Sequence, residues 1–214
     1  MTFRAVETLK SVSLVACEDT RRTLQLLNHF SIKCRLISCR ARNESAAAAK
    51  VIEVLASGAD AAYASDAGTP GVSDPGSVLV RAVREAGYEA VPIPGASAFA
   101  SLVSVAGGLD KTVVFEGFLS PKPGRRRSRL AELLAAETGF VLYESPFRVL
   151  KLLADLADLD GERYVCVGRE MTKLHEEYLT GSAAETAGIL AEREKSLGEF
   201  AVYVSGKKSG KLLE

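Results

Sequence analysis

Short apolar runs alternate with amphipathic helical segments along the first half of the chain, and this alternation constrains the fold most. The apolar runs, at residues 14–17, 36–38, 59–64 and 90–93, are typical of buried strands. Helical periodicity covers residues 3–12, 21–29, a segment from Asn43 or Ser45 to residue 57, and residues 77–86 and 98–106. Strands separated by helices of this length pair in parallel through right-handed crossovers. The sequence therefore predicts an α/β fold with a mostly parallel sheet in this half.

The pattern changes beyond Gly107 and Gly108. Expected strands lie at residues 113–118, 140–143, 164–169, 177–180 and 200–204, with helices at 130–137, 146–156 and 183–194. Some neighbouring strands have no helix between them, which predicts a mixed, partly antiparallel sheet. We expect two domains, residues 1–109 and 110–206, followed by a frayed tail at residues 207–214.

The charge balance excludes a strongly basic surface overall. Lys plus Arg and Asp plus Glu each total 27, so nucleic-acid binding would depend on a local patch. The four cysteines form no CxxC pair, and two isolated histidines predict no metal site. Buried free thiols indicate a reducing compartment. No apolar run has the length of a membrane span, so we expect a cytoplasmic protein that binds no membrane.

Residues 65–76, SDAGTPGVSDPG, follow one expected strand and precede a helix. The carboxyl ends of strands in open α/β sheets are where ligands bind. Three glycines allow close approach of the backbone to a ligand, and two aspartates can accept hydrogen bonds. The segment lacks the Lys of a phosphate-binding loop and the spacing of a dinucleotide fingerprint. This favours a small ligand with hydrogen-bond donors, and the alternative is a long structural turn.

Further polar clusters stand at other expected strand ends. Residues 17–22, CEDTRR, combine acids with arginines that orient a substrate or, alternatively, cap a helix with solvated charges. Residues 94–98, PGASA, form a helix start that attracts an anion or is a plain cap. Residues 122–129 hold five cations, suited to several phosphates or to a solvated charge run. Polar residues also stand at expected strand ends in the second half, at residues 143–148 and 168–177. Polar clusters at strand ends in both halves predict a ligand cleft between two domains.

Five segments in this order resemble the tetrapyrrole-methylase superfamily of S-adenosylmethionine-dependent methyltransferases: SDAGTPGVSDPG, PIPGASA, FEGFLSPKPGRRRSRL, LYESPFR and REMTKLHEE. The similarity runs from about residue 2 to residue 204. Within the superfamily, the chain is most similar to the bacterial group that 2′-O-methylates a cytidine of 16S rRNA. The resemblance implies two α/β domains with S-adenosylmethionine in the cleft between them, a homodimer, and a substrate at the decoding centre of the small ribosomal subunit.

The resemblance also implies roles for individual residues. Implied cofactor contacts are Ser65, Asp66, Ala67, Gly68, Thr69, Gly95, Ser97, Ala98, Tyr143, Glu144, Ser145, Arg169 and Thr172, and Glu170 and Lys173 belong to the segment that closes the cleft. We expect Arg21, Lys122, Arg125, Arg126, Arg127 and Arg129 to bind RNA. Candidate bases or orienting groups are Glu18, Lys173 and Glu176. A lysine acts as a base only where burial or neighbouring cations lower its pKa.

Two departures from the family pattern qualify these expectations. Phe147 stands where the family usually has a histidine. The chain also begins at the helix that in the family follows a strand and a Gly-rich loop, so we expect the first sheet to lack a strand and to leave backbone groups exposed. Two alternatives remain: a methyltransferase for a small tetrapyrrole-like molecule, and a catalytically impaired homologue that only binds cofactor or RNA.

Overall fold

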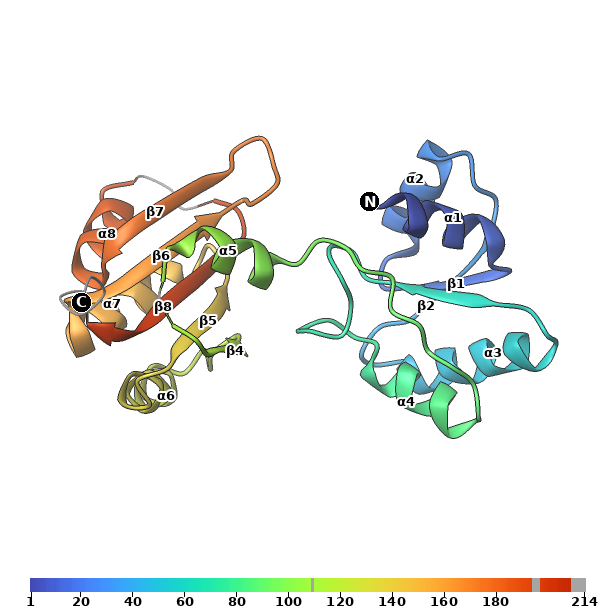
Figure 1. Ribbon diagram of the computed structural model, residues 1–214, viewed down its shortest axis with the longest axis horizontal. Coiled ribbons are helices and arrows are strands. Elements are labelled where there is room, and N and C mark those ends of the chain that lie inside the picture. The colour runs from blue at the N-terminus through green and yellow to red at the C-terminus, as the bar shows by residue number, and fades with distance from the viewer. Residues whose placement is uncertain (109, 194–196, 209–214) are drawn as a thin grey trace. The chain divides into compact units, whose positions relative to one another are not determined.

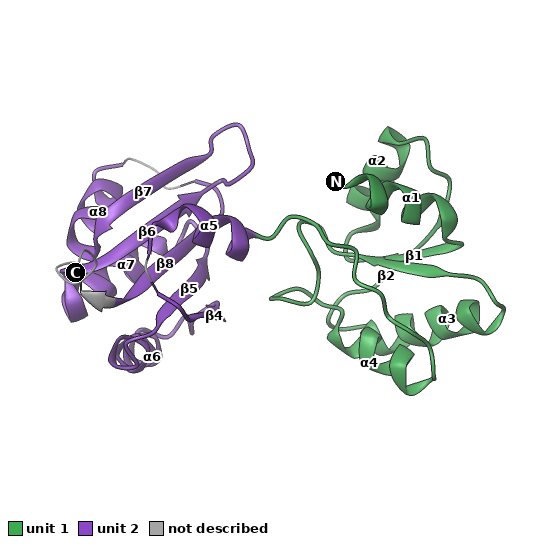
Figure 2. Ribbon diagram, viewed as in Figure 1, with its two compact units in different colours: residues 1–97 green, residues 98–214 purple. Residues whose placement is uncertain are grey.

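The computed structural model describes residues 1–108, 110–193 and 197–208, and it divides into two compact units, Met1–Ser97 and Ala98–Glu214 (Figure 2). The sequence placed the boundary after residue 109 instead. Helix α5 (Ala98–Ala106) accounts for the difference, because its Leu102 packs with Val141 and Cys166 of the second sheet. The hydrophobic clusters of the described residues each lie within one unit, and each unit is described by itself.

The first unit is built on three parallel strands in the order β2-β1-β3, as the alternation predicted (Figure 1). They are β1 (Leu14–Cys17), β2 (Arg35–Ser38) and β3 (Ala61–Ala64), with Leu14 opposite both Arg35 and Ala61. Helices α1 (Phe3–Ser11) and α2 (Thr20–His29) pack with Val15 and Cys17. Helices α3 (Glu44–Ala56) and α4 (Ser77–Glu85) pack with Leu14 and Ala16. Alternate residues of β1 therefore serve two cores, one on each face of the sheet.

The strand expected at residues 90–93 is absent from the described structure. Val91 is 56% exposed. A strand needs a neighbouring ladder for its amides and carbonyls, and within the described residues β3 pairs with β1 alone. Apolar composition without a neighbour to pair with does not make a strand.

The second unit contains a five-stranded mixed sheet in the order β4-β5-β8-β6-β7, confirming the expected change of pattern. The strands are β4 (Val113–Gly117), β5 (Gly139–Glu144), β6 (Arg163–Arg169), β7 (Glu177–Ser182) and β8 (Phe200–Lys208). Among the described strands of this sheet, only β4 and β5 pair in parallel. The expected tail begins inside β8, and its residues 209–214 lie outside the described part.

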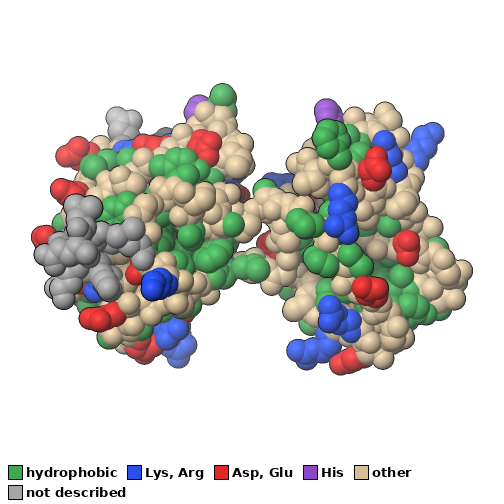
Figure 3. All heavy atoms as spheres, viewed as in Figure 1, with side chains coloured by type: hydrophobic (Ala, Val, Ile, Leu, Met, Phe, Trp, Pro, Cys, Tyr) green, Lys and Arg blue, Asp and Glu red, His purple; other side chains and the backbone are tan. Residues whose placement is uncertain are grey.

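Helices cover both faces of this sheet. Helices α6 (Pro123–Ala135), α7 (Val149–Asp160) and α8 (Ala183–Ala191) pack with Phe140 and Leu142, whereas α5 packs on the other face. No described helix is long and apolar enough to cross a membrane. Acidic and basic side chains are interspersed on the visible face of each unit (Figure 3), in keeping with the balanced composition.

Candidate functional site

The carboxyl edge of the first sheet brings two sequence-predicted segments together. The Asp19 amide donates to Oδ1 of Asp66 at 3.0 Å, and the Asp66 amide donates to Oε2 of Glu18 at 3.4 Å. Because β1 and β3 are adjacent and parallel, their carboxyl ends meet at the same edge. Glu18, Asp19 and Asp66 therefore form one half-buried cluster at the start of the segment from residue 65 to residue 76, called the 65–76 loop below.

The middle of the 65–76 loop lies against the second predicted cofactor segment. The amide and the hydroxyl of Thr69 both donate to the Ala96 carbonyl, at 2.9 and 3.2 Å. Gly68 has a φ of 74°, and a Cβ there would lie 3.2 Å from the same carbonyl oxygen. The Ser65 hydroxyl donates to the Ala67 and Gly68 carbonyls at 3.3 and 3.2 Å. The structure thus juxtaposes residues 65–69 with residues 95–97.

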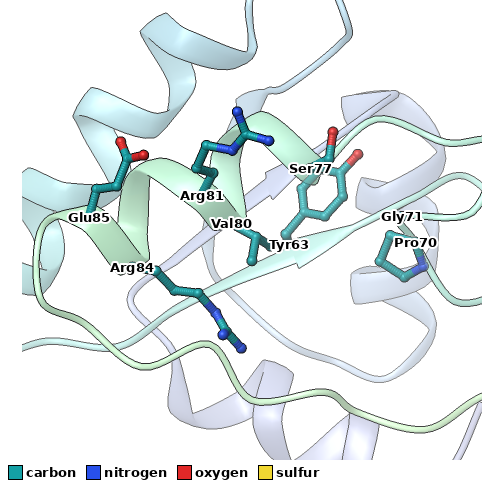
Figure 4. A pocket seen from close by; sticks show the side chains of 9 residues that line it. Tyr63, Pro70, Gly71, Ser77, Val80, Arg81, Arg84 and Glu85 are labelled. Atoms are coloured by element: carbon teal, nitrogen blue, oxygen red, sulfur yellow. The ribbon is translucent and has the colours of Figure 1, made fainter.

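The far end of the loop is held by two residues that the sequence analysis did not single out. The Tyr63 hydroxyl donates to the Pro75 carbonyl at 2.9 Å. The buried Glu44 carboxylate accepts hydrogen bonds from the amides of Gly76 and Val78. Beside this end runs an open groove of about 680 Å³. Arg81, Arg84 and Glu85 project from α4 around it and Tyr63 projects from β3 (Figure 4).

Carboxylates dominate the electrostatics at this edge. Burial, and then the charges of Glu18 and Asp66, raise the pKa of Asp74 above its ordinary value. Arg22 Nη1 is 3.8 Å from Oδ2 of Asp66, and Arg40 Nε donates to the Glu18 carbonyl at 2.9 Å. The cluster therefore offers hydrogen-bond acceptors and negative charge, which suit hydroxyl, ammonium or sulfonium groups.

The predicted second-unit residues at the end of β5 differ in what their side chains can do. Tyr143 joins an aromatic cluster, with ring centroids 4.8 Å from Phe115 and 5.9 Å from Phe118. Glu144 is 3% exposed, pairs with Nη2 of Arg148 at 2.7 Å, and accepts from the Ser145 amide at 2.7 Å. Its carboxylate is thus occupied within the protein. Phe147, at the family's histidine position, is 87% exposed.

Ion pairs of Lys173 connect two parts of the segment between β6 and β7 to each other and to Glu199, which precedes β8. Lys173 Nζ lies 2.8 Å from Oε1 of Glu170 and 3.0 Å from Oε2 of Glu199. The Glu170 carboxylate, followed by Glu199, raises the pKa of Lys173 above its ordinary value. A lysine base needs a lowered pKa, so the condition set from the sequence is not met and Lys173 is a cation here.

Two other predicted residues of this segment also have partners. The Tyr178 hydroxyl donates to Oε1 of Glu176 at 2.6 Å and lowers the pKa of that carboxylate, which weakens it as a base. Arg169 Nε donates to the Leu197 carbonyl at 2.7 Å, and Nη1 lies 3.4 Å from Oε2 of Glu177. Thr172, in the segment between β6 and β7, has a positive φ of 67°.

The basic segment precedes the helix expected at residues 130–137, but it is itself largely helical. Helix α6 begins at Pro123, a residue favoured at the first helical position. Arg126 is buried and pairs with Asp155 at 2.6 Å. Arg127 pairs with Asp155 and Asp158, and Arg129 with Glu116 and Glu132. Arg126 is thus placed to stabilise the core rather than to reach RNA, which corrects the uniform role expected for these cations.

The remaining predicted RNA contacts are exposed. Lys122 and Arg125 have no ion pair among the described residues. Arg21 is exposed, but its guanidinium pairs with Asp19 at 2.9 Å, and this pairing holds the pKa of Asp19 well below its usual range. The described residues contain no cluster of three or more His, Cys, Asp or Glu side chains suited to a metal.

Comparison with solved structures identifies the class of fold. The methyltransferase CobJ superposes with a TM-score of 0.68 at 18% identity, covering 96% of this chain and 87% of that chain. The cobalt precorrin-4 methyltransferase CbiF superposes with a TM-score of 0.64 at 12% identity, covering 96% and 88%. The two units together thus have the α/β fold of these methyltransferases.

Sequence comparison then identifies the family. The profile described as Tetrapyrrole (Corrin/Porphyrin) Methylases matches residues 1–187, so the chain belongs to that family. The ribosomal RNA small subunit methyltransferase I of Borrelia garinii subsp. bavariensis is 44% identical over 98% of this chain and 94% of its own length. The proteins of the same name from Thermotoga maritima and Bacillus subtilis are 41% and 36% identical, over 97% and 98% of this chain and 93% and 71% of their own lengths. The family resemblance inferred from the motifs is confirmed.

Proposed function

We propose that this chain is an S-adenosylmethionine-dependent methyltransferase that methylates the 2′-hydroxyl of a cytidine in 16S rRNA. The observation that carries the proposal is the 44% identity to a small-subunit rRNA methyltransferase over 98% of the chain. We propose that the reaction takes place in the cytoplasm, because the proposed substrate is ribosomal. We also propose a homodimer, as the resemblance implies.

The 65–76 loop and the segment against it fit S-adenosylmethionine, which supplies a methyl group on a positively charged sulfur. Asp66 provides negative charge and acceptors for its ribose hydroxyls or ammonium group. Gly68 keeps the surface free of a side chain where a Cβ would already approach the Ala96 carbonyl. The proposed contacts of the first unit are Ser65, Asp66, Ala67, Gly68, Thr69, Gly95 and Ser97. Contacts at Ala98, Tyr143, Glu144, Ser145, Arg169 and Thr172 stay predictions.

The residues of this chain would act mainly by positioning the ribose hydroxyl, because effective molarity is a large source of rate in group transfer. Loss of the hydroxyl proton is assisted by a general base. Of the three candidates, Glu18 remains the best supported: it is half-buried and lies beside Asp66, whereas Lys173 is held charged and Tyr178 weakens Glu176. Lys173 is better suited to orienting a phosphate or carboxylate.

RNA phosphates are assigned to Lys122 and Arg125, which lie at the start of α6 and are exposed. Arg127 and Arg129 are partly exposed and share their charge with carboxylates, so they contribute less in this proposal. Arg21 stays a predicted contact. Guanidinium and ammonium groups at one helix start position the RNA backbone without reading its sequence.

A methyl-transfer assay tests the function. The purified chain is incubated with methyl-labelled S-adenosylmethionine and 30S subunits from a strain that lacks this methylation, and the 16S rRNA is digested and examined for 2′-O-methylcytidine. We expect label in that nucleoside, and at least tenfold less at subsaturating cofactor for Asp66→Asn. Asp60→Asn, an exposed change in the same unit, is the matched control.

The same assay separates the alternatives. The family is described by methylation of corrins and porphyrins, which makes a small tetrapyrrole-like molecule the second candidate substrate, so a tetrapyrrole precursor is tested in parallel. Label in the precursor and none in rRNA would overturn the proposal in favour of that candidate. Cofactor binding in calorimetric titration without transfer to either substrate would instead identify a binding protein.

A further inference from the structure

Glu44 is a buried carboxylate to which the proposed reaction gives no role. It is the first residue of α3 and is 5% exposed. A carboxylate shielded from water is costly unless hydrogen bonds compensate for lost hydration. The compensation comes from the end of the 65–76 loop and the start of α4, where the amides of Gly76 and Val78 donate to its two oxygens, the latter at 3.3 Å.

These two amides belong to the start of α4. Gly76 is the N-cap residue of that helix and has no side chain with which to cap it. The first amides of a helix lack partners within the helix and carry partial positive charge. Glu44 thus supplies from α3 the acceptor that a Ser or Asp at the cap usually supplies locally.

A local cap is prevented by Tyr63. Gly76 has a φ of 130°, and a Cβ there would lie 2.8 Å from Cε1 of the Tyr63 ring. Tyr63 in turn donates to the carbonyl of Pro75 at 2.9 Å. The position of the chain at residues 75–76 is therefore set by two side chains from outside the 65–76 loop, one from α3 and one from β3.

We infer that Glu44 is a positioning residue of the cofactor site: it fixes the far end of the 65–76 loop and thereby the placement of the residues that contact the cofactor. The inference rests on the proposed function for the identity of the ligand. Its carboxylate does not touch the ligand but acts through Gly76 and the loop. Removing its charge should therefore weaken cofactor binding more than it slows transfer at saturating cofactor.

The test compares Glu44→Gln with Glu53→Gln, an exposed change on the same helix. Calorimetric titration with S-adenosylmethionine is expected to give about tenfold weaker binding for Glu44→Gln and unchanged binding for Glu53→Gln. In the methyl-transfer assay, we expect KM for the cofactor to rise about tenfold and kcat to stay within twofold. Equal affinity of Glu44→Gln and the parent chain would overturn the inference.

A second variant separates positioning from plain helix capping. Ser77 is the exposed first residue of α4, and Ser77→Asp adds a carboxylate in the first turn, where it stabilises the helix. In Glu44→Gln with Ser77→Asp, we expect the melting temperature to recover while the cofactor affinity stays about tenfold weak, because the tie to α3 is still absent. Recovery of affinity together with stability would show that Glu44 only caps α4.

Amide hydrogen exchange makes the result independent of the proposed function. The amides of Gly76 and Val78 are expected to exchange at least tenfold faster in Glu44→Gln than in Glu53→Gln, both without ligand. Unchanged exchange would overturn the role of Glu44 in holding the loop. Failure of the parent chain to bind S-adenosylmethionine would overturn the proposed function instead, and the exchange rates would still decide whether Glu44 holds the loop.

Discussion

Asp155→Asn should destabilise the second unit strongly, because it leaves a buried charge without its partner. The Arg126 side chain is 5% exposed, and its Nε lies 2.6 Å from Oδ2 of Asp155. Oδ1 of the same carboxylate is 2.9 Å from Nη1 of Arg127. Asparagine keeps the shape but removes the charge that both arginines face. Removing one partner of a buried ion pair costs about 3–5 kcal/mol.

Urea unfolding followed by circular dichroism measures this cost. At a few degrees per kcal/mol, a loss of this size lowers the melting temperature by roughly 10–20 °C. The control is Asp158→Asn, because the Asp158 side chain is 68% exposed and its pair with Arg127 at 3.0 Å should be worth no more than about 1 kcal/mol. Arg126→Met with Asp155→Leu replaces the pair by apolar groups and should recover most of the stability. A loss below about 1 kcal/mol for Asp155→Asn, or no recovery in the double variant, would refute the reasoning.

Three further predictions follow from other sites. Arg125→Gln should reduce the salt dependence of RNA binding by about 0.7 in logarithmic slope, since it removes one phosphate contact, whereas the double variant Arg126→Met with Asp155→Leu should leave the slope unchanged; equal effects in a filter-binding series would contradict the assignment. Gly76→Ala should cost about 1–3 kcal/mol in urea unfolding, because φ is 130° and the new Cβ meets Tyr63; a neutral result would show that the loop relaxes. Folding raises the pKa of Asp74, so its protonated form is favoured in the folded state: the resulting stability is present below the ordinary value of 3.8 and is lost as the pH rises through the raised value. Asp74→Asn should therefore flatten the melting temperature over that window and raise it at neutral pH, and an unchanged pH profile would argue against the raised pKa.

Local sequence patterns predicted much of the fold. Leu14–Cys17 is a strand with the expected bounds, since a short apolar run between helices has few other solutions. The strand at residues 90–93 failed, because strand formation depends on a neighbour that composition cannot reveal. The sequence predicted that the helix after the basic segment begins only at residue 130, because the preceding residues are polar and basic. In the structure, Arg126 donates a hydrogen bond to Asp155 of α7, which lies 29 residues away in the sequence.

The candidate site shows the same division between local and distant information. The 65–76 loop and its position after a strand were readable, because Gly, Pro and Asp at a strand end have a known structural meaning. Glu44 and Tyr63 were not, since their contacts are with residues 32 and 12 positions away. Only the Asn-Glu pair at the start of α3 was available as a signal, and it indicated no more than a helix cap. Lys173 pairs with Glu170, three residues before it, and also with Glu199, a partner from a different part of the chain that local patterns could not reveal.

The hydrogen bonds from Thr69 to Ala96 also constrain the segment that leads out of the first unit. Ala96 stands two residues before α5, the helix that packs in the core of the second unit. The chain leaving the first unit is therefore pinned to the middle of the 65–76 loop. A ligand that orders Thr69 also restricts the segment around Ala96 that connects to α5. Thermodynamic linkage requires that restricting this connector strengthens ligand binding by the same free energy. A substitution at Ala96, which stands between the proposed contacts Gly95 and Ser97 but is not itself one of them, should accordingly change ligand affinity.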